Sequence, residues 1–390
     1  MTLGKLYSRT CNLQKLLDKN SFFLFGPRAT GKTHLIKQQL STSAFIVDLL
    51  KGSTYQRLSA EPSLLEEMIH AEKSKNPRIE IIVLDEVQKL PLLLNEVHRL
   101  IEEHGWRFLL CGSSARQLKK EGTNLLAGRA WRAELFPLTS FELGKDFHLD
   151  HYLQWGGLPR VYNSDSPADE LEAYTDLYIK EEILQESVVR NLPKFSHFLK
   201  LAALSSGQQL HYQAIASDIG VSAPTVREYY QILKDTLLAF ELLPYSETKK
   251  RKAVATSKVY LFDPGVIQYL SQMTSLERAS DIYGNRFEQW VGMELRAYLS
   301  YRRKKEPLCY WRTQSQQEVD FIIGNHTAIE VKATKNVQAR HLDGLLALQE
   351  ERIFKSYYLV SQDPVLREKD GITLIPYTDW ISRLWGGLII

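Results

Sequence analysis

A loop able to bind phosphate follows an apolar segment near the start of the chain. Residues 21–25 (SFFLF) run into Gly-Pro-Arg-Ala-Thr-Gly-Lys-Thr, and the helical pattern HLIKQQL comes next. Glycines let the backbone N–H groups of such a loop curl around phosphate oxygens at the positive end of the helix. Lys32 would reach the β- and γ-phosphates, and Thr33 would place its hydroxyl on Mg²⁺. The spacing therefore predicts an ATP site formed by Gly26, Pro27, Arg28, Ala29, Thr30, Gly31, Lys32 and Thr33.

A second apolar segment supplies the acids that hydrolysis at such a loop requires. This segment, residues 79–85 (IEIIVLD), ends in Asp85, and Glu86 follows it directly. Asp85 can hold Mg²⁺ through water, and Glu86 can orient or polarise the attacking water. Apolar strands often end in acids, so the pair is informative only together with the loop. The two elements jointly predict Mg²⁺-dependent hydrolysis of ATP.

A third pattern with chemical meaning lies near the C-terminal end. Asp320, Glu330 and Lys332 are spaced as D-x₉-E-x-K. This pattern resembles the core of the PD-(D/E)xK nucleases, as does an upstream helix that bears Glu288 and Glu294. The resemblance implies that Asp320 and Glu330 share Mg²⁺ and that a helix glutamate completes the metal shell. It also implies that Lys332 positions or activates a water for attack on phosphorus.

The register of the hairpin that carries this pattern follows from the length of its loop. If residues 324–326 form a three-residue loop, positions that sum to 650 pair, and Asp320 lies opposite Glu330 at about 5 Å. The two carboxylates would repel each other by roughly 3 kcal/mol at an effective dielectric near 20, so Lys332 or a metal must compensate. The alternative is an ion pair between Glu318 and Lys332 on a solvated face, with the acids placed incidentally.

Alternating apolar and helical segments must position these residues. Residues 21–25, 44–49, 79–85 and 106–111 have strand length, and helical stretches separate them. That alternation predicts an α/β fold, a parallel sheet with helices on its faces. We expect an ATPase core at 1–145, a helical lid at 146–205, a winged helix-turn-helix at 206–270 and a restriction-endonuclease-like α/β domain at 271–390.

Residues 212–233 have the pattern of two helices joined by a tight turn. Gly220 would make the turn, Ser222 would cap the second helix, and Pro224 would sit harmlessly in its first turn. The following polar run would form a wing with a basic tip that neutralises DNA phosphates, at Lys249, Lys250, Arg251 and Lys252. The second interpretation is a structural winged helix with a solvated hairpin, because the second helix mixes acids and bases.

Composition limits the classes of protein that fit. The 390 residues contain 49 basic and 46 acidic side chains, so the net charge of +3 allows only a local nucleic-acid surface. The three cysteines are far apart, which argues against a disulfide scaffold and favours a reducing cytoplasm. No apolar run approaches the ~20 residues of a membrane span, and the first residues lack the apolar core of a signal peptide.

The chain resembles the AAA-type ATPases, and more closely a prokaryotic ATPase family with a C-terminal domain of unknown function. GPRATGKT, VLDEVQKLP, LLCGSSARQL and LLAGRAWRAELFPLTSFEL carry this resemblance. It implies that Ser113 or Ser114 senses the γ-phosphate and that Arg129 lies near the nucleotide, within one subunit or toward a neighbour. GGLPRVY resembles an element in which Pro159 packs near the base. An ordinary surface arginine and a simple helix-breaking turn are the respective alternatives.

These patterns lead to two functional hypotheses. The first is a nucleic-acid-associated ATPase whose nucleotide state controls a C-terminal unit that cleaves DNA with Mg²⁺. This hypothesis allows a homo-oligomer. The second is a regulatory switch ATPase whose winged helix and C-terminal domain bind a protein partner without cleavage. The run from Arg302 to Lys305 either touches nucleic acid or forms a solvated loop.

Overall fold

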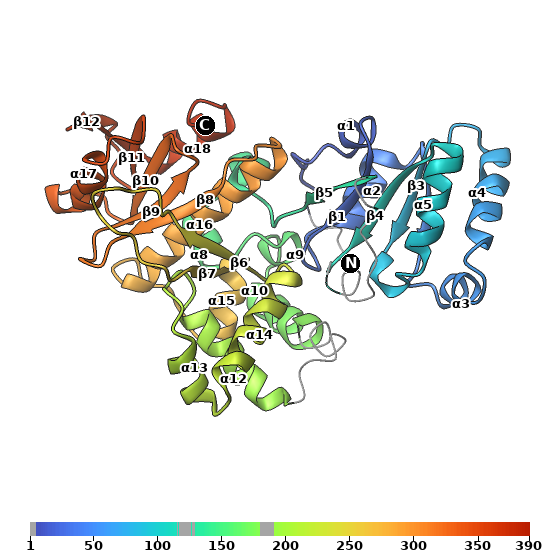
Figure 1. The fold of residues 1–390 in the computed structure, drawn as a ribbon, viewed down its shortest axis with the longest axis horizontal. Coiled ribbons are helices and arrows are strands. Elements are labelled where there is room, and N and C mark those ends of the chain that lie inside the picture. Colours follow the sequence, from blue (N-terminus) through green and yellow to red (C-terminus); the bar gives the residue numbers. More distant parts are fainter. Residues whose placement is uncertain (1–4, 115, 117–125, 127–128, 180–190) are drawn as a thin grey trace.

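The structure is a computed structural model, and it describes residues 5–114, 116, 126, 129–179 and 191–390. Two sheets lie at opposite ends of the molecule, and a group of helices from the middle of the chain lies below and between them (Figure 1). None of the helices in the described ranges combines the length and the apolar character that crossing a bilayer requires.

The N-terminal sheet is parallel throughout, with strand order β2-β3-β4-β1-β5. Alternate residues of β1 face opposite sides: Phe22 and Leu24 pack with α1 and α2, and Phe23 and Phe25 pack with α3, α4 and α5. A strand covered on both faces must be apolar throughout, as SFFLF is. The predicted α/β core is thereby confirmed. Its elements are α1 (Leu13–Leu17), β1 (Ser21–Phe25), α2 (Lys32–Leu40), β2 (Ala44–Asp48), α3 (Gly52–Ala60), α4 (Leu64–Lys75), β3 (Ile81–Asp85), η1 (Val87–Lys89), α5 (Leu93–His104), β4 (Arg107–Gly112) and β5 (Ala130–Glu134).

The C-terminal sheet is mixed, with strand order β12-β13-β11-β10-β9-β8-β6-β7. The long helix α16 packs on one face with many aromatic side chains, and α17 packs on the other. This unit comprises α16 (Asp281–Tyr301), β8 (Leu308–Arg312), β9 (Glu318–Ile323), β10 (Thr327–Lys332), η5 (Ala339–Leu342), α17 (Asp343–Gln349), β11 (Ser356–Ser361), β12 (Arg367–Lys369), β13 (Ile372–Pro376) and α18 (Tyr377–Trp385).

The middle of the chain is helical and then forms a hairpin. Its elements are α7 (Ser140–Leu143), η3 (Gly144–Asp146), α8 (Leu149–Trp155), α9 (Pro159–Tyr162), α10 (Pro167–Ala173), η4 (Tyr174–Ile179), α12 (Leu192–Leu204), α13 (Tyr212–Ile219), α14 (Ala223–Asp235), β6 (Ala239–Pro244), β7 (Lys258–Leu261) and α15 (Pro264–Leu270). As the sequence predicts, Gly220 adopts a left-handed conformation between α13 and α14, and the Ser222 hydroxyl accepts a hydrogen bond from the Thr225 N–H.

The hairpin of β6 and β7 does not stand apart from the C-terminal unit. β6 pairs in parallel with β8, so the two strands extend the C-terminal sheet. A boundary at residue 270 therefore cuts through one continuous sheet. Sequence patterns miss this because the pairing joins segments about 65 positions apart, Leu243 with Cys309.

Two glycines test how closely the middle helices pack. A Cβ at Gly265 in α15 would lie 2.1 Å from the Trp155 carbonyl oxygen, whereas a Cβ at Gly284 in α16 would meet no heavy atom within 4 Å. We expect Gly265→Ala to lower the free energy of unfolding by about 1–3 kcal/mol through overpacking. Gly284→Ala, the matched control, should raise it by about 0.5–1 kcal/mol. Chemical denaturation measures both, and equal stabilities would contradict the packing described.

Candidate functional site

The phosphate loop connects the end of β1 to the start of α2. A Cβ at Gly26 would lie 2.5 Å from the Leu135 carbonyl oxygen, so only glycine fits there. Gly31 has φ +93° and caps α2, a conformation that side chains disfavour. Thr30 is buried, and its hydroxyl donates to the Pro27 carbonyl at 2.8 Å. Both glycines of the motif are therefore required by the backbone path.

The loop and the acid at the end of β3 meet directly. The Thr33 hydroxyl donates to Asp85 Oδ2 at 3.0 Å, across 52 positions of sequence. The other oxygen, Asp85 Oδ1, is buried and has no hydrogen-bond partner. A hydroxyl beside an unsatisfied carboxylate oxygen is the donor set that Mg²⁺ prefers. Thr33 and Asp85 thus fit the ion that a triphosphate brings with it.

Lys32 is folded back onto its own loop. Its ammonium donates to the carbonyl oxygens of Gly26 at 2.6 Å and Pro27 at 3.0 Å, and the side chain is buried. Binding of a triphosphate would exchange these two carbonyls for phosphate oxygens.

Glu86 is held in place by a residue that the motif analysis missed. Gln88 donates through its side-chain amide to the Glu86 carboxylate and to the Ser113 hydroxyl, the latter at 3.2 Å. Ser114 instead accepts the N–H of Arg116. Ser113 is therefore the serine that connects to Glu86 through Gln88. The position of Gln88, two residues after Glu86, is the only sequence signal that could have pointed to it.

Arg129 lies at the other end of the sheet from the loop of its own chain. Arg129 immediately precedes β5, and the first residue of β5, Ala130, pairs with Ser21 at the start of β1. The Arg129 side chain forms an ion pair with Glu102 near the end of α5. Five strand residues separate that edge from the loop, about 16 Å. The prediction that Arg129 lies near the nucleotide is therefore wrong for nucleotide bound to the same chain, because the parallel strand places it at the amino edge.

The GGLP element packs against the middle helices. The Gly157 N–H donates to Asp263 Oδ2 at 2.8 Å, and Pro159 begins α9. A Cβ at Gly156 would collide with the Asp263 carboxylate. These contacts account for the glycines, and the role of Pro159 at a nucleotide base stays a prediction.

Two further arginines connect the nucleotide edge to the rest of the chain. Arg116, which follows the sensing segment, bonds to Glu228 and Asp235 of α14. The buried guanidinium of Arg9 donates to the Thr30 carbonyl at 2.7 Å and lies against Tyr301 at the end of α16. Helix α14 is thus bonded to the segment after β4, and the phosphate loop is bonded to an N-terminal arginine that no motif contains.

The hairpin of β9 and β10 has the predicted register. Ile323 pairs with Thr327, Ile322 with Ala328 and Phe321 with Ile329, each pair summing to 650. Beyond them the Asp320 carboxylate accepts the Val331 N–H at 2.8 Å. Asp320 and Glu330 are the next residues along these neighbouring strands, and both are buried.

The compensating charges come from two lysines. Lys332 forms an ion pair with Glu330, as one of the two predicted solutions requires. Lys258 of β7, which the sequence did not single out, bonds to Glu288 at 3.2 Å and forms an ion pair with Glu318. Glu318 also pairs with Arg312 rather than with Lys332. The solvated Glu318–Lys332 pair is therefore not formed.

The two helix glutamates separate into different roles. Glu288 lies close enough to Asp320 and Glu330 to raise the pKa of both. Glu294 instead accepts hydrogen bonds from the Ser140 N–H at 2.6 Å and the Trp385 indole at 2.9 Å. Glu288 is the helix carboxylate of the site.

Burial dominates the electrostatics of this cluster. It raises the pKa of Asp320 well above its usual range, and the charges of Glu288 and Glu330 raise it further. Burial also raises the pKa of Glu330, against the lowering effect of Lys332. Glu330 Oε2 is buried without a hydrogen-bond partner, so the donor chemistry suits a divalent cation.

The carboxylates are nevertheless not drawn together as tightly as metal ligands. Within the described ranges, the one group of three potential ligands with all ligand atoms within 4.8 Å is Glu66, His70 and His104. Binding of an ion by Asp320 and Glu330 together with Glu288 would therefore require side-chain movement, beginning with release of Lys332.

The basic wing is attached to the C-terminal unit. The N–H groups of Lys249, Lys250 and Arg251 all donate to the Glu351 carboxylate at 2.8–2.9 Å. Arg251 also pairs with Glu350, while Lys249, Lys250 and Lys252 stay exposed. The segment is thus bound to the C-terminal unit through its backbone, and Arg251 is already paired. Binding of DNA phosphates by the wing stays a prediction.

Three stretches of the chain match known domain families. Residues 18–144 match an AAA domain, residues 146–277 a domain of unknown function (DUF8612) and residues 283–380 a second domain of unknown function (DUF4143). Residues 18–144 form an AAA-type P-loop domain. The phosphate loop and Asp85 described above both lie inside it.

Similar proteins extend over most of the chain. An uncharacterized protein of Mycobacterium tuberculosis is 26% identical over 328 residues, 80% of this chain and 70% of its own. An uncharacterized protein of Haemophilus influenzae is 22% identical and covers 97% of this chain and 99% of its own. Domain III of the Thermotoga maritima replication initiation protein DnaA is 18% identical over 56% of this chain and 84% of its own, with a TM-score of 0.24.

The burial of the Glu294 carboxyl group predicts that the folding stability depends on pH. Burial raises the pKa of Glu294 from 4.5 to about 7, against the hydrogen bonds from Ser140 and Trp385. Between these pH values the unfolded chain loses the proton that the folded chain keeps, so folding stability falls as pH rises. Glu294→Gln removes this component, and the wild type should lose roughly 3 kcal/mol relative to it between about pH 4.5 and 7. Parallel stability curves from urea denaturation would contradict this assignment.

Proposed function

We propose that the protein hydrolyses ATP in its AAA-type domain and that its C-terminal domain cleaves nucleic acid with Mg²⁺. The observation that carries the first part is the hydrogen bond between Thr33 and Asp85, which joins the loop to the acid of β3. The second part is supported by the gathering of Glu288 from α16 with Asp320, Glu330 and two lysines from the C-terminal sheet.

The chain's own groups would act in a defined order at the ATP site. The loop N–H groups and Lys32 bind the β- and γ-phosphates, and Thr33 and Asp85 provide oxygen ligands. Mg²⁺, when bound, neutralises charge that develops on the phosphate oxygens. Gln88 holds Glu86, and Glu86 orients the attacking water. Ser113 would contact the γ-phosphate, and the Gln88 amide connects it to Glu86. Lys32 must leave the carbonyls of Gly26 and Pro27 first.

Nucleic-acid cleavage would use the C-terminal cluster. The acids at 288, 320 and 330 are the oxygen ligands available there, and a divalent cation, when bound, supplies Lewis acidity at phosphorus. Lys332 would then turn from Glu330 toward the attacking water.

A specific observation favours the regulatory alternative. Lys258 and Lys332 already neutralise the acids of the C-terminal cluster, and Arg116 bonds to α14. Such an arrangement suits a switch in which nucleotide state moves the middle helices against a protein partner. The cleavage experiment below separates the two functions.

Removal of the loop ammonium should abolish ATP turnover. We expect Lys32→Ala to lower kcat/KM by about 100-fold or more, since Lys32 is the charged donor to the transferred phosphate. Lys37→Ala removes an exposed lysine from the same helix and should leave the rate within twofold of the wild type (about the error of such assays). Phosphate release measures both, and retained turnover in Lys32→Ala would refute the proposed ATP site.

Cleavage should depend on Glu288 and not on Glu294. In a plasmid-nicking assay with Mg²⁺ or Mn²⁺, we expect Glu288→Gln, Asp320→Ala and Lys332→Ala each to lose about 100-fold or more. Glu294→Gln, on the same helix, should cleave like the wild type. Equal activity in all variants would indicate a contaminant or another site, and an inactive wild type would favour the regulatory switch.

A further inference from the structure

A large cavity lies away from both sites described above. It measures about 1060 Å³, slightly above the roughly 300–1,000 Å³ usual for small-molecule pockets. Its walls come from three separate parts of the chain: the segment of α1, the edge strand β5, and the end of α16 with the residues that follow it. It opens beside the start of β1 at Phe22, whereas the phosphate loop follows the other end of that strand.

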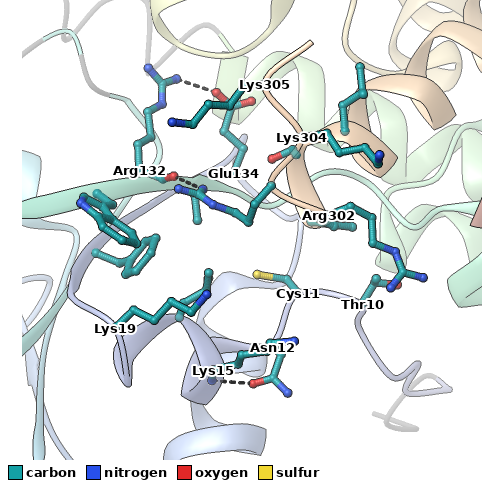
Figure 2. A pocket seen from close by; sticks show the side chains of 18 residues that line it. Thr10, Cys11, Asn12, Lys15, Lys19, Arg132, Glu134, Arg302, Lys304 and Lys305 are labelled. Atoms are coloured by element: carbon teal, nitrogen blue, oxygen red, sulfur yellow. Dashed lines mark hydrogen bonds and ion pairs between the residues drawn. The ribbon is translucent and has the colours of Figure 1, made fainter. Parts of the chain in front are cut away.

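The walls of this cavity are strongly basic. Seven cationic side chains line it against a single acid, Glu134, which is already paired with Arg132 and Arg296. The cationic residues are Lys15, Lys19, Arg132, Arg302, Arg303, Lys304 and Lys305. Figure 2 shows the two lysines of the α1 segment facing Arg132, Lys304 and Lys305 across the cavity.

This charge is large compared with that of the whole protein. The lining side chains sum to +6, and the complete chain carries +3, so all other residues together carry −3. The net charge of the residues that line the cavity is thus larger than the net charge of the whole chain. A local patch of this kind is what a chain with a small net charge needs in order to attract a polyanion.

Several of these cations are available to a ligand. Arg302 is anchored to the Trp385 carbonyl and Arg303 to the Arg132 carbonyl. In the described part of the chain, Lys15, Lys19 and Lys305 form no ion pair and are exposed. Like charges gathered without carboxylates repel one another, and phosphates would relieve that repulsion.

An exposed aromatic side chain completes the cavity wall. Trp131 of β5 is 43% exposed, and it is held edge-on against Phe22, with ring centroids 5.7 Å apart. A partly exposed indole beside free lysines is the combination that binds unpaired bases by stacking while cations follow the phosphates. Inorganic phosphate or a duplex would make no use of the indole face.

From these observations we propose that this basic cavity binds single-stranded nucleic acid. This binding site is separate from the two candidate catalytic sites. The proposal rests on the proposed function only in that both involve nucleic acid. The cavity is also connected to the ATP site through two residues, Tyr301 and Arg9. Tyr301 lines it and contacts Arg9, which holds the Thr30 carbonyl of the phosphate loop. Tyr301 and Arg9 therefore connect a strand bound in the cavity to the phosphate loop.

Binding can be measured by fluorescence anisotropy on the full chain with a labelled oligothymidylate of about 20 nucleotides, which exceeds the roughly 4–16 nucleotides of single binding domains. The buffer contains EDTA and no ATP, so a failure of cleavage or hydrolysis leaves this test unaffected. The cavity variant is Lys15→Ala/Lys19→Ala/Lys305→Ala. The matched control removes three exposed lysines elsewhere, as Lys51→Ala/Lys355→Ala/Lys369→Ala.

We expect the cavity variant to bind about tenfold or more weakly at about 0.05 M salt, and its salt slope to fall by about 2, as three lost phosphate contacts predict. The control should stay within about twofold. Equal losses in the two variants, a loss in the control alone, or no loss in either would overturn the proposal.

Trp131 tests whether bases take part. Trp131→Ala should weaken binding roughly tenfold with an unchanged salt slope, and Trp131→Tyr, which keeps an aromatic face, should restore most of it. A duplex of the same length should bind more weakly than the single strand. Unchanged binding by Trp131→Ala, or preference for the duplex, would overturn the single-stranded assignment in favour of a general polyanion surface.

Discussion

The buried guanidinium of Arg9 is the interaction on which the arrangement of the nucleotide site depends. Burial of a cation is costly unless a counter-charge and several acceptors satisfy it. Arg9 has Glu142 at 3.1 Å and donates to the carbonyls of Thr30 and Phe136 at 2.7 and 2.6 Å. Burial lowers the pKa of Arg9, but Tyr301 and Glu142 together raise it above its usual value, so the side chain stays charged. The Arg9 side chain thus contacts the phosphate loop at Thr30, the segment after β5 at Phe136 and the C-terminal unit at Tyr301.

This connection gives the loop a physical route to the C-terminal domain. The hydroxyl of Tyr301, at the last position of α16, contacts Arg9 and also accepts the Phe136 N–H at 3.2 Å. The same helix carries Glu288 nearer its start and Glu294 in its middle. A 21-residue helix is about 31 Å long. Contacts through Arg9 and Tyr301 thus connect the Thr30 carbonyl to the helix that carries Glu288.

Sequence reasoning succeeded where chemistry is local and failed where partners come from afar. The loop and the hairpin register follow from spacing, because a strand end and a three-residue turn fix geometry within a few positions. Asp85 follows from its motif, although its contact with Thr33 spans 52 positions. Gln88, Lys258 and Arg9 were missed, since each becomes part of a site only through folding. The motif of Arg129 left open whether it serves the nucleotide of its own chain or of a neighbour. Its place before β5 argues only against the first, and the second stays a prediction.

The two catalytic candidates share one arrangement of charges, and it explains how they could respond to ligand. In each, a lysine bonds to an acceptor of its own site, Lys32 to loop carbonyls and Lys332 to Glu330. In each, one carboxylate oxygen is buried without a partner, Asp85 Oδ1 and Glu330 Oε2. Such an orphan costs about 1–3 kcal/mol. A cation that satisfied it would also repel the lysine, so ligand arrival would exchange partners at side-chain tips while the backbone stays as it is.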